Sequence, residues 1–409
     1  MFPGNFVATT PDKPAVIRPS TGERLTYREL DERSTRLARH LRSLGLKVGD
    51  HLALVSSNDL RVLEVYWAAL RSGLYITVVN WHLTPRRKPV TSWTTAEPRC
   101  SSCPPTPAAP CRATRISFPR VRHRLVYGGV LDGFDSYDDA VEAQSAEPLD
   151  SQPRGQDMLY SSGTTGRPKG IKPALPEGEV DTTMDPYTAV FAPMYGFDSD
   201  TVYLCPAPLY HAAPLRFCGT ITSVGGTIVL MDRFDAEESL RLIEEYRVTH
   251  SQWVPTMFVR MLKLPKDVRD KFDVSSLKVA IHAAAPCPPD VKLSMIEWWG
   301  PVIHEYYAST EGAGATFIDS ARPLPSRDRW ATTGSWASCT SATTTVRTYP
   351  SVTSEPSTGR GMNGRSYITT TRPRPNPRHT PTIRPGPRAA TSGTSTPTAS
   401  STSPTAPRS

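Results

Sequence analysis

The strongest constraint on the fold is an alternation of strand-like and helix-like segments that occurs in two parts of the chain. In residues 14–80, and again in residues 226–282, short apolar runs alternate with segments whose apolar residues recur at helical spacing. The first such helical stripe consists of Leu30, Leu37, Leu41 and Leu44. This alternation is typical of mostly parallel sheets with helices packed on them. The sequence therefore predicts an α/β fold with one or two doubly wound sheets.

The same pattern predicts the boundaries of individual elements. Strands are expected at residues 52–55, 74–79, 226–231, 250–254 and 277–282, and helices at 60–70 and 235–246. The helix at 235–246 begins with Asp235, and Glu238 follows three positions later. An Asp and a Glu at this spacing indicate a capping box at the start of a helix.

Residues 86–117 and 323–409 interrupt this pattern. Both are rich in Pro, Arg, Thr and Ser and show neither a two-residue nor a 3.6-residue period. Such a composition is typical of disordered linkers and irregular tails, and a GC-rich gene translated out of frame yields it as well. Back-translation with a shifted frame turns residues 87–104 into a helix followed by a buried strand, and it restores strand-like alternation after Ser326. We therefore hypothesise that both segments are frameshift products, which the nucleotide sequence of the gene decides.

The charge of the chain is concentrated at one end. The 409 residues carry a formal net charge of +8. Residues 323–409 contain eleven Arg, no Lys and two acids, a charge of +9 that leaves residues 1–322 near −1. Because those Arg are scattered among Pro and Thr without interleaved aromatic residues, we expect no nucleic-acid binding.

The cysteines and the hydropathy indicate the compartment. Seven Cys occur without a regular framework, and the sequence shows neither a secretory leader nor an apolar run long enough to span a bilayer. We therefore expect a cytoplasmic protein with at most peripheral membrane contact. Cys100 and Cys103 have the spacing of a zinc half-site, and Cys111 lies nearby. Because a second half-site is lacking, zinc is not expected.

Residues 160–170, with the sequence YSSGTTGRPKG, have the composition of a phosphate-binding loop. Gly allows consecutive backbone N–H groups to point at an anion, hydroxyl groups donate to phosphate oxygens, and Lys169 adds a positive charge. The loop is not a Walker A motif, because Lys169 follows Pro168 and precedes Gly170. A solvated turn is the alternative interpretation.

This loop resembles the signature phosphate loop of the adenylate-forming superfamily, which includes acyl-CoA synthetases, luciferases and the adenylation domains of peptide synthetases. Two later blocks agree in order, PLYH at 208–211 and YYASTEG at 306–312. The resemblance implies an adenylate-forming domain over residues 1–322, followed by the tail at 323–409. Beyond residue 322 the family has an Asp that binds ribose, a hinge and a small domain with a catalytic Lys. None of these occurs in the frame given.

The resemblance also implies the site residues. It assigns nucleotide or cofactor contacts to Ser161, Ser162, Gly163, Thr164, Thr165, Gly166, Lys169, Ala284, Ala285, Pro286, Tyr307 and Thr310. It assigns catalytic roles to Lys169, His211, Thr310 and Glu311, and Mg²⁺ ligation to Thr164 and Glu311. The residue types fit, since Tyr307 offers a π face, Thr310 a hydroxyl and Glu311 a hard oxygen ligand. A surface carboxylate is the alternative for Glu311.

Two of these assignments depend on the resemblance more than on the residues. His211 lies between Leu209 and Ala212, where a lone His is usually a core residue, whereas the family places a His or aromatic residue beside the acyl pocket. The small residues at 283–286 allow close approach of the backbone to adenine and the acyl group, or they simply pack. His282 stands where many relatives have Gly.

The resemblance implies an acyl-CoA ligase. In that reaction a carboxylate attacks the α-phosphorus of ATP with Mg²⁺ bound, and the thiol of coenzyme A then attacks the acyl-adenylate. A fatty acid is the first expected substrate among carboxylic acids. The alternatives are an adenylation enzyme for an aromatic or amino acid, and a nucleotide-binding remnant that has lost its activity.

Overall fold

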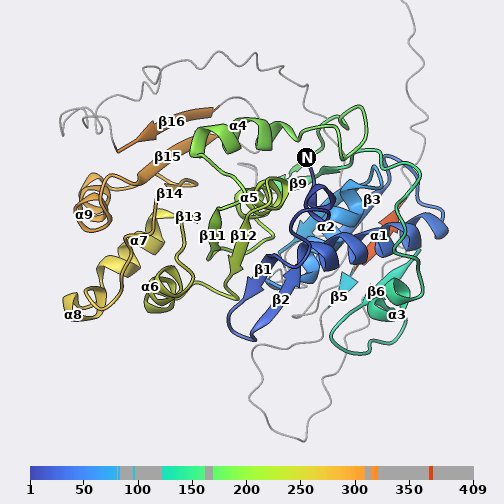
Figure 1. Ribbon diagram of the computed structural model, residues 1–409, viewed down its shortest axis with the longest axis horizontal. Helices are drawn as coiled ribbons and strands as arrows, with labels where there is room; N and C mark the ends of the chain where they lie inside the picture. Colours follow the sequence, from blue (N-terminus) through green and yellow to red (C-terminus); the bar gives the residue numbers. More distant parts are fainter. Residues whose placement is uncertain are drawn as a thin grey trace, which may run out of the picture. The chain divides into compact units, whose positions relative to one another are not determined.

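The computed structural model describes residues 1–80, 82, 95–96, 122–161, 169–308, 315–320 and 368–371. The chain divides into a unit of residues 1–373 and a unit of residues 374–409, and all described residues belong to the first. Two sheets and the helices packed on them form this part of the chain (Figure 1). The predicted α/β fold with doubly wound sheets is therefore confirmed.

An eight-stranded sheet contains most of the second half of the described chain. Its strands, in spatial order, are β16 (Ala315–Asp319), β15 (Ile303–Ala308), β14 (Val279–His282), β13 (His250–Trp253), β11 (Val202–Cys205), β12 (Thr227–Leu230), β1 (Pro14–Arg18) and β2 (Glu23–Thr26). Only β16 and β2, at its two edges, run antiparallel to their neighbours. The six strands between them are parallel, so their carboxyl ends lie along one edge.

A seven-stranded sheet forms from six strands between residues 51 and 157 and one strand at residues 368–371. Its strands are β17 (Ile368–Thr371), β6 (Arg124–Val126), β5 (Thr95–Ala96), β3 (His51–Val55), β4 (Tyr75–Val79) and β8 (Gln156–Asp157), with β7 (Asp135–Ser136) paired to β6. A separate hairpin consists of β9 (Leu159–Ser161) and β10 (Lys169–Ile171). The strand β17 runs antiparallel along β3, beside the parallel pairing of β5 with Val55.

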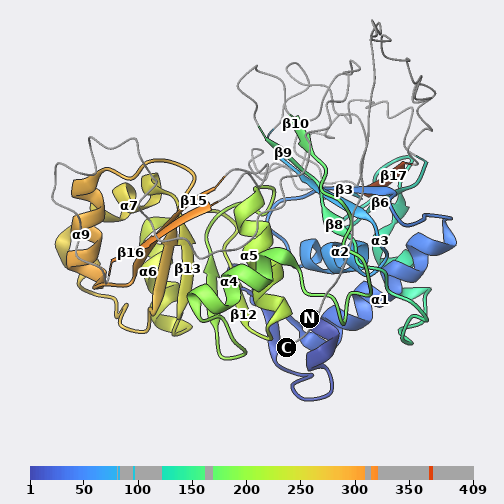
Figure 2. The same ribbon diagram turned by 90° about the horizontal axis from the view of Figure 1, so that it is seen from above.

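Helices cover both faces of the eight-stranded sheet (Figures 1 and 2). On one face, α6 (Ala236–Glu245), α7 (Pro255–Leu262) and α9 (Pro289–Trp299) form a core around Trp253, with the short α8 (Lys266–Arg269) beyond them. On the other face lie α4 (Pro186–Tyr195) and α5 (Ala212–Ser223). Their core continues into the seven-stranded sheet through α1 (Tyr27–Ser43) and α2 (Arg61–Leu70), while η1 (Pro3–Phe6) and α3 (Tyr137–Glu142) lie at its margin.

Helix α2 joins the two halves of this core. Its residues from Val62 to Leu70 are all buried, because the helix has protein on every side. The indole N–H of Trp67 donates a hydrogen bond to the Thr222 hydroxyl of α5 at 3.0 Å. The two sheets therefore share one continuous apolar interior, and a change in one is transmitted to the other by packing.

The predicted elements agree with the structure at most positions. The stripe of Leu30, Leu37 and Leu41 is buried in α1, and the expected strands correspond to β3, β4, β12, β13 and β14. Asp235 caps α6 by accepting from the Glu238 N–H at 3.0 Å. The carboxylate of Glu238 pairs with Arg241, so the structure shows one half of the predicted capping box. The complete box is at Thr26 and Glu29.

Most of the two segments with irregular composition falls outside the described residues. Within them the structure describes only Thr95–Ala96 and Ile368–Thr371, as strands β5 and β17. The frameshift hypothesis therefore stays untested, and the CxxC pair at Cys100 and Cys103 lies outside the described residues. None of the described helices is long and apolar enough to cross a membrane.

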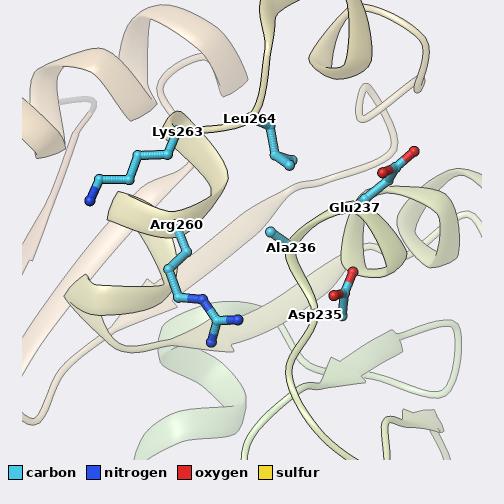
Figure 3. A pocket seen from close by; sticks show the side chains of 6 residues that line it. All are labelled: Asp235, Ala236, Glu237, Arg260, Lys263 and Leu264. Atoms are coloured by element: carbon cyan, nitrogen blue, oxygen red, sulfur yellow. The ribbon is translucent and has the colours of Figure 1, made fainter.

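A pocket of about 380 Å³ opens between the start of α6 and the end of α7 (Figure 3). It is lined by Asp235, Ala236, Glu237, Arg260, Lys263 and Leu264. Its lining includes two acidic and two basic side chains, so the charges of the lining residues balance. None of the predicted site residues lines it.

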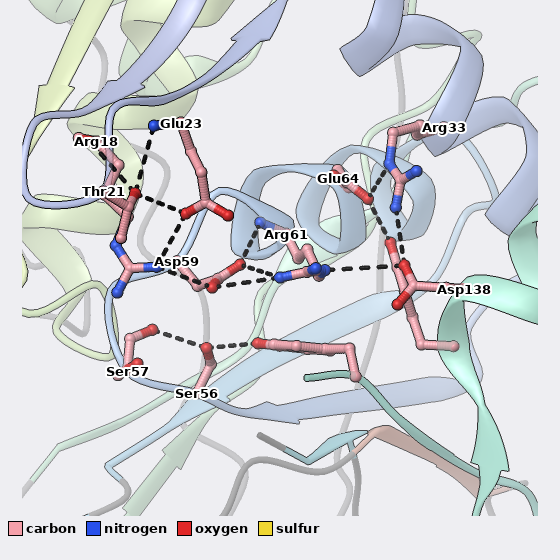
Figure 4. Close-up of polar contacts among 12 residues, drawn as sticks. Arg18, Thr21, Glu23, Arg33, Ser56, Ser57, Asp59, Arg61, Glu64 and Asp138 are labelled. Carbon is pink, nitrogen blue, oxygen red and sulfur yellow. Dashed lines mark hydrogen bonds and ion pairs between the residues drawn. The ribbon is translucent and has the colours of Figure 1, made fainter. Parts of the chain in front are cut away.

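A network of charged side chains connects the eight-stranded sheet to α1 and α2 (Figure 4). Arg18 of β1 pairs with Asp59 at 3.4 Å, and Asp59 pairs with Arg61 at 3.3 Å. One turn further along α2, the buried Glu64 pairs with Arg33 of α1 at 2.9 Å. Burying charges costs desolvation energy that roughly offsets their attraction. The network therefore fixes the orientation of these elements more than it adds to their stability.

Gly155, just before β8, lies where two backbone segments pack closely at the edge of the seven-stranded sheet. Its N–H donates to the Leu70 carbonyl at 2.6 Å, and a Cβ at this position would lie 2.4 Å from the Leu74 carbonyl oxygen. We expect Gly155→Ala to lower the free energy of unfolding by about 3 kcal/mol, because backbone has to move. Gly45→Ala is the control, since Gly45 has φ +81° and open space around it. It should cost only about 1 kcal/mol, and equal losses in urea unfolding would contradict the prediction.

Candidate active site at the carboxyl edges of the two sheets

Asn58 connects the carboxyl edges of the two sheets. It follows β3 and is 3% exposed. Its amide donates to the carbonyls of Ala207 at 3.0 Å and Met231 at 2.7 Å, and its Oδ1 accepts from the Leu209 N–H at 2.9 Å. Ala207 and Met231 follow the carboxyl ends of β11 and β12. Ligands of open α/β sheets bind at such strand ends, so this junction is a candidate ligand-binding site.

The loop after β4 reaches the same place. The ring of His82 contacts the ring of Tyr210 edge-on, with their centroids 6.3 Å apart. Tyr210 belongs to the PLYH block that the Asn58 amide holds through Leu209. Two strand ends of the seven-stranded sheet therefore contact one loop of the other sheet.

The predicted phosphate loop leaves the seven-stranded sheet at this edge. The Met158 N–H donates to the Ile76 carbonyl at 2.8 Å, which continues the parallel pairing of β4 and β8. The chain then enters β9, and Ser161 at its end is paired with Lys169 at the start of β10. Residues 162–168 are thus the loop of a hairpin whose base is set by the sheet.

His211 occupies the N-cap position of α5. Its side chain does not cap the helix, and its ring lies against Tyr210 with centroids 4.6 Å apart. The side chain is exposed to solvent, while the protein atoms that surround part of the ring lower its pKa below the ordinary value. The alternative of a core histidine is therefore excluded, and the imidazole of His211 lies at the start of a helix with access to solvent.

The turn at 283–286 follows β14 directly. Ala283 is buried, whereas Ala284, Ala285 and Pro286 are exposed to solvent. Ala284 has φ +73°, a left-handed conformation that costs an Ala residue about 1 kcal/mol. A non-glycine residue held in this conformation marks a place where the surrounding structure dictates the backbone. The turn therefore presents small side chains on a constrained backbone.

Tyr307 lies near the carboxyl end of β15 and is 61% exposed. Ala308 at the end of β15 is paired with Ala315 at the start of β16, so residues 309–314 connect these two antiparallel strands. A large aromatic ring with this exposure beside an exposed turn of small residues is a suitable platform for a flat heterocycle.

Several predicted residues lie outside the described part of the chain. They are Ser162, Gly163, Thr164, Thr165 and Gly166 in the hairpin loop, and Thr310 and Glu311 between β15 and β16. Within the described ranges, no group of three or more His, Cys, Asp or Glu side chains is arranged to hold a metal ion. The structure does bring the ends of both segments, His211 and the turn at 283–286 to carboxyl edges of strands.

Asn58 was not predicted as a site residue. Its signal in the sequence is the polar run of residues 56–59 directly after a buried strand and before a helix. In an α/β fold that position is at the edge where ligands bind. What the sequence cannot show is the partner of Asn58, which lies about 150 residues further along the chain.

The chain is similar to known proteins both in sequence and in fold. Residues 5–345 match the model of a family described as AMP-binding enzyme. The chain is 31% identical over 311 residues to feruloyl-CoA synthase of Streptomyces sp, covering 73% of this chain and 57% of that protein. It is 28% identical over 319 residues to 4-coumarate–CoA ligase 1 of Oryza sativa subsp. japonica, covering 73% and 54%. The chain thus spans about half the length of the curated relatives it matches.

A solved structure with a similar fold is the fatty acyl CoA synthetase of Mycobacterium tuberculosis. The TM-score is 0.58 at 21% identity, with 77% of this chain and 60% of that chain covered. At this level of identity the similarity shows a shared fold.

The buried histidines of the eight-stranded sheet predict how stability depends on pH. Burial lowers the pKa of His250 to about 4, and burial together with the charge of Lys292 lowers that of His282 to about 3. Both are neutral in the folded protein, while the unfolded chain takes up protons below about pH 6.5. Their contribution to stability is therefore complete above pH 6.5. It is lost as the pH falls, by up to about 1.4 kcal/mol per histidine and pH unit.

We expect the melting temperature to fall between pH 6.5 and pH 4.5, and to fall less steeply in His282→Leu than in the unsubstituted protein. Leu has a similar volume and cannot be protonated. The measurement is thermal unfolding across pH 4.5 to 8 for both proteins. Parallel pH profiles would contradict the assignment of a depressed pKa to His282.

Proposed function

Because the chain belongs to the AMP-binding enzyme family, we propose that it is an ATP-dependent acid–thiol ligase that joins a carboxylic acid to coenzyme A through an acyl-adenylate. The observation that carries this proposal is the meeting of the two carboxyl edges at Asn58. That junction gathers the base of a phosphate-type hairpin loop and a neutral histidine at a helix start. A loop that neutralises phosphate charge and a hydrogen-bond donor that positions the acid would both favour attack of a carboxylate on a phosphate.

The nucleotide would bind along the carboxyl edge of the eight-stranded sheet. Tyr307 supplies an exposed ring for the adenine, and the turn at 284–286 allows the purine to approach the backbone. The N–H and hydroxyl groups of residues 161–166 would cradle the phosphates, and Lys169 would neutralise their charge. Thr164 and Glu311 would hold Mg²⁺, since hydroxyl and carboxylate oxygens suit this ion, which neutralises polyphosphate charge when bound.

The carboxylic acid would bind at the start of α5. Since His211 does not cap this helix with its side chain, the positive end of the helix dipole faces an incoming anion. Partial burial keeps the imidazole of His211 neutral near pH 7, so its N–H can donate to a carboxylate oxygen without an ion pair that would weaken the nucleophile. Positioning and charge neutralisation account for most of the catalysis expected in such a transfer.

The first proposed substrate is a fatty acid, and the second is an aromatic acid of the hydroxycinnamate type. The second class is supported by the relatives described as feruloyl-CoA synthase and 4-coumarate–CoA ligase.

Tyr307 provides the prediction for nucleotide binding. We expect Tyr307→Ala to weaken ATP binding about tenfold, because stacking of a base on an aromatic ring contributes on the order of 1–3 kcal/mol. Tyr307→Phe is the matched control and should bind ATP like the unsubstituted protein. Dissociation constants come from isothermal titration with ATP and Mg²⁺. Equal affinity of the Ala and Phe variants would argue against adenine stacking on this ring.

A substrate panel tests the reaction itself. Pyrophosphate release is measured with ATP, Mg²⁺ and coenzyme A in the presence of octanoate, palmitate, 4-coumarate or ferulate. We expect release that depends on one acid of the panel, and His211→Ala should lower its rate at least tenfold with little change in ATP affinity. ATP binding without release for any acid would instead favour a nucleotide-binding remnant.

A further inference from the structure

Three buried ionisable side chains meet beneath the candidate nucleotide site. They are His282 at the end of β14, Lys292 in α9 and Glu305 in β15, with exposed fractions of 0%, 5% and 7%. The Lys292 ammonium donates to Glu305 Oε2 at 2.7 Å, and His282 Nε2 lies 3.7 Å from the same oxygen. One carboxylate oxygen therefore faces a group from each of two other elements.

Stability alone does not explain this cluster. A buried Lys–Glu pair gains little net free energy, because its attraction is offset by the cost of removing both charges from water. Neither ring nitrogen of His282 has a hydrogen-bond partner among the described residues, and an unsatisfied buried polar atom is destabilising. Apolar side chains of similar volume would fill this space at no loss of stability. We therefore infer that the cluster fixes the relative positions of the elements that carry its three side chains.

The two side chains nearest the Glu305 carboxylate flank one turn. His282 directly precedes the exposed turn at 283–286, and Lys292 follows it in the first half of α9. Within that turn Ala284 adopts the strained left-handed conformation at φ +73°. An exposed turn has few packing contacts that could maintain such a conformation. The residues on either side of the turn therefore have to be fixed in position. The Ala283 N–H also donates to the Trp253 carbonyl at 3.3 Å, which fixes the turn to β13 on one side.

Glu305 and Tyr307 lie on the same strand. The two residues are separated by one position on β15, so their side chains emerge on the same face of the strand. Glu305 is buried and Tyr307 is exposed. The carboxylate that binds Lys292 and the exposed ring therefore belong to the same short stretch of β15.

We propose that Glu305 is a positioning residue of the nucleotide site: through Lys292 its carboxylate fixes the helix that follows the turn at 283–286 to the strand that carries Tyr307. This inference rests on the proposed function, because the adenine is proposed to bind beside the turn and the ring. The cluster does not touch the reacting atoms. It acts by keeping the turn and the ring in a fixed relative position before the nucleotide arrives.

The test replaces the charged pair in the full-length chain with apolar side chains of similar volume, Lys292→Met together with Glu305→Leu. Hydrogen exchange of the protein without nucleotide is expected to become at least tenfold faster at residues 283–287 and 305–308. The melting temperature should stay within a few degrees of the original. The matched control is Lys266→Met with Asp270→Asn, an exposed Lys–carboxylate pair of α8 at 2.5 Å. It should change neither quantity.

Titration with ATP and Mg²⁺ gives the second measurement. The double variant is expected to bind ATP about tenfold more weakly than the unsubstituted protein, with the KM for the acid unchanged. Unchanged exchange at residues 283–287 in a double variant that melts normally would overturn the inference. If the double variant lost its cooperative transition, Lys292→Gln together with Glu305→Gln, which removes both charges and keeps polar side chains of similar length, would carry the same comparison.

The two hypotheses can fail separately. Absence of ATP binding by the unsubstituted protein would overturn the proposed function and the nucleotide part of this inference. The exchange rates would still decide whether the cluster holds the turn. Conversely, normal ATP binding by both proteins together with unchanged exchange would overturn the positioning role alone.

Discussion

The arrangement of the site depends on the side-chain amide of Asn58. An amide can make four hydrogen bonds, and three are made here, to two loops of the other sheet. Because the group is buried, the loss of any one bond would leave a polar atom unsatisfied in a low-dielectric interior. The amide therefore specifies one relative position of the carboxyl ends of β3, β11 and β12. An apolar contact, which tolerates sliding, could not do so.

The charged network around Asp59 acts on the same junction from a second direction. Asn58 and Asp59 are adjacent in sequence, and Asp59 pairs with Arg18 of the opposite sheet, which in turn pairs with Asp232 at 2.6 Å. Met231 and Asp232 follow β12, so two neighbouring residues of one sheet hold two neighbouring residues of the other. Such a double attachment resists rotation as well as translation. The apolar packing of α2 then supplies the free energy that these polar contacts do not.

The alternation of apolar periods was sufficient to predict the sheets, because buried parallel strands and amphipathic helices differ clearly in period. It predicted α1 through Leu30, Leu37 and Leu41, but it missed the capping box at Thr26 and Glu29. The position of His211 at a helix start could not be derived from its apolar neighbours, because local composition does not show which side of a helix end faces solvent. Asn58 was missed because its partners are distant in sequence, and hydrogen-bond partners of that kind leave no periodic signal.

The buried cluster of His282, Lys292 and Glu305 could not be predicted from local sequence either. The sequence analysis singled out neither Lys292 nor Glu305, because local composition does not show that a charged residue is buried. Each alone is unfavourable in a buried position, and only their pairing at 2.7 Å makes both tolerable. Mutual dependence of this kind makes the geometry strict, since moving either side chain leaves a buried charge without a partner. A turn that must keep a left-handed Ala284 beside a solvent-exposed ring needs that strictness, because neither solvent nor apolar packing would restore it once displaced.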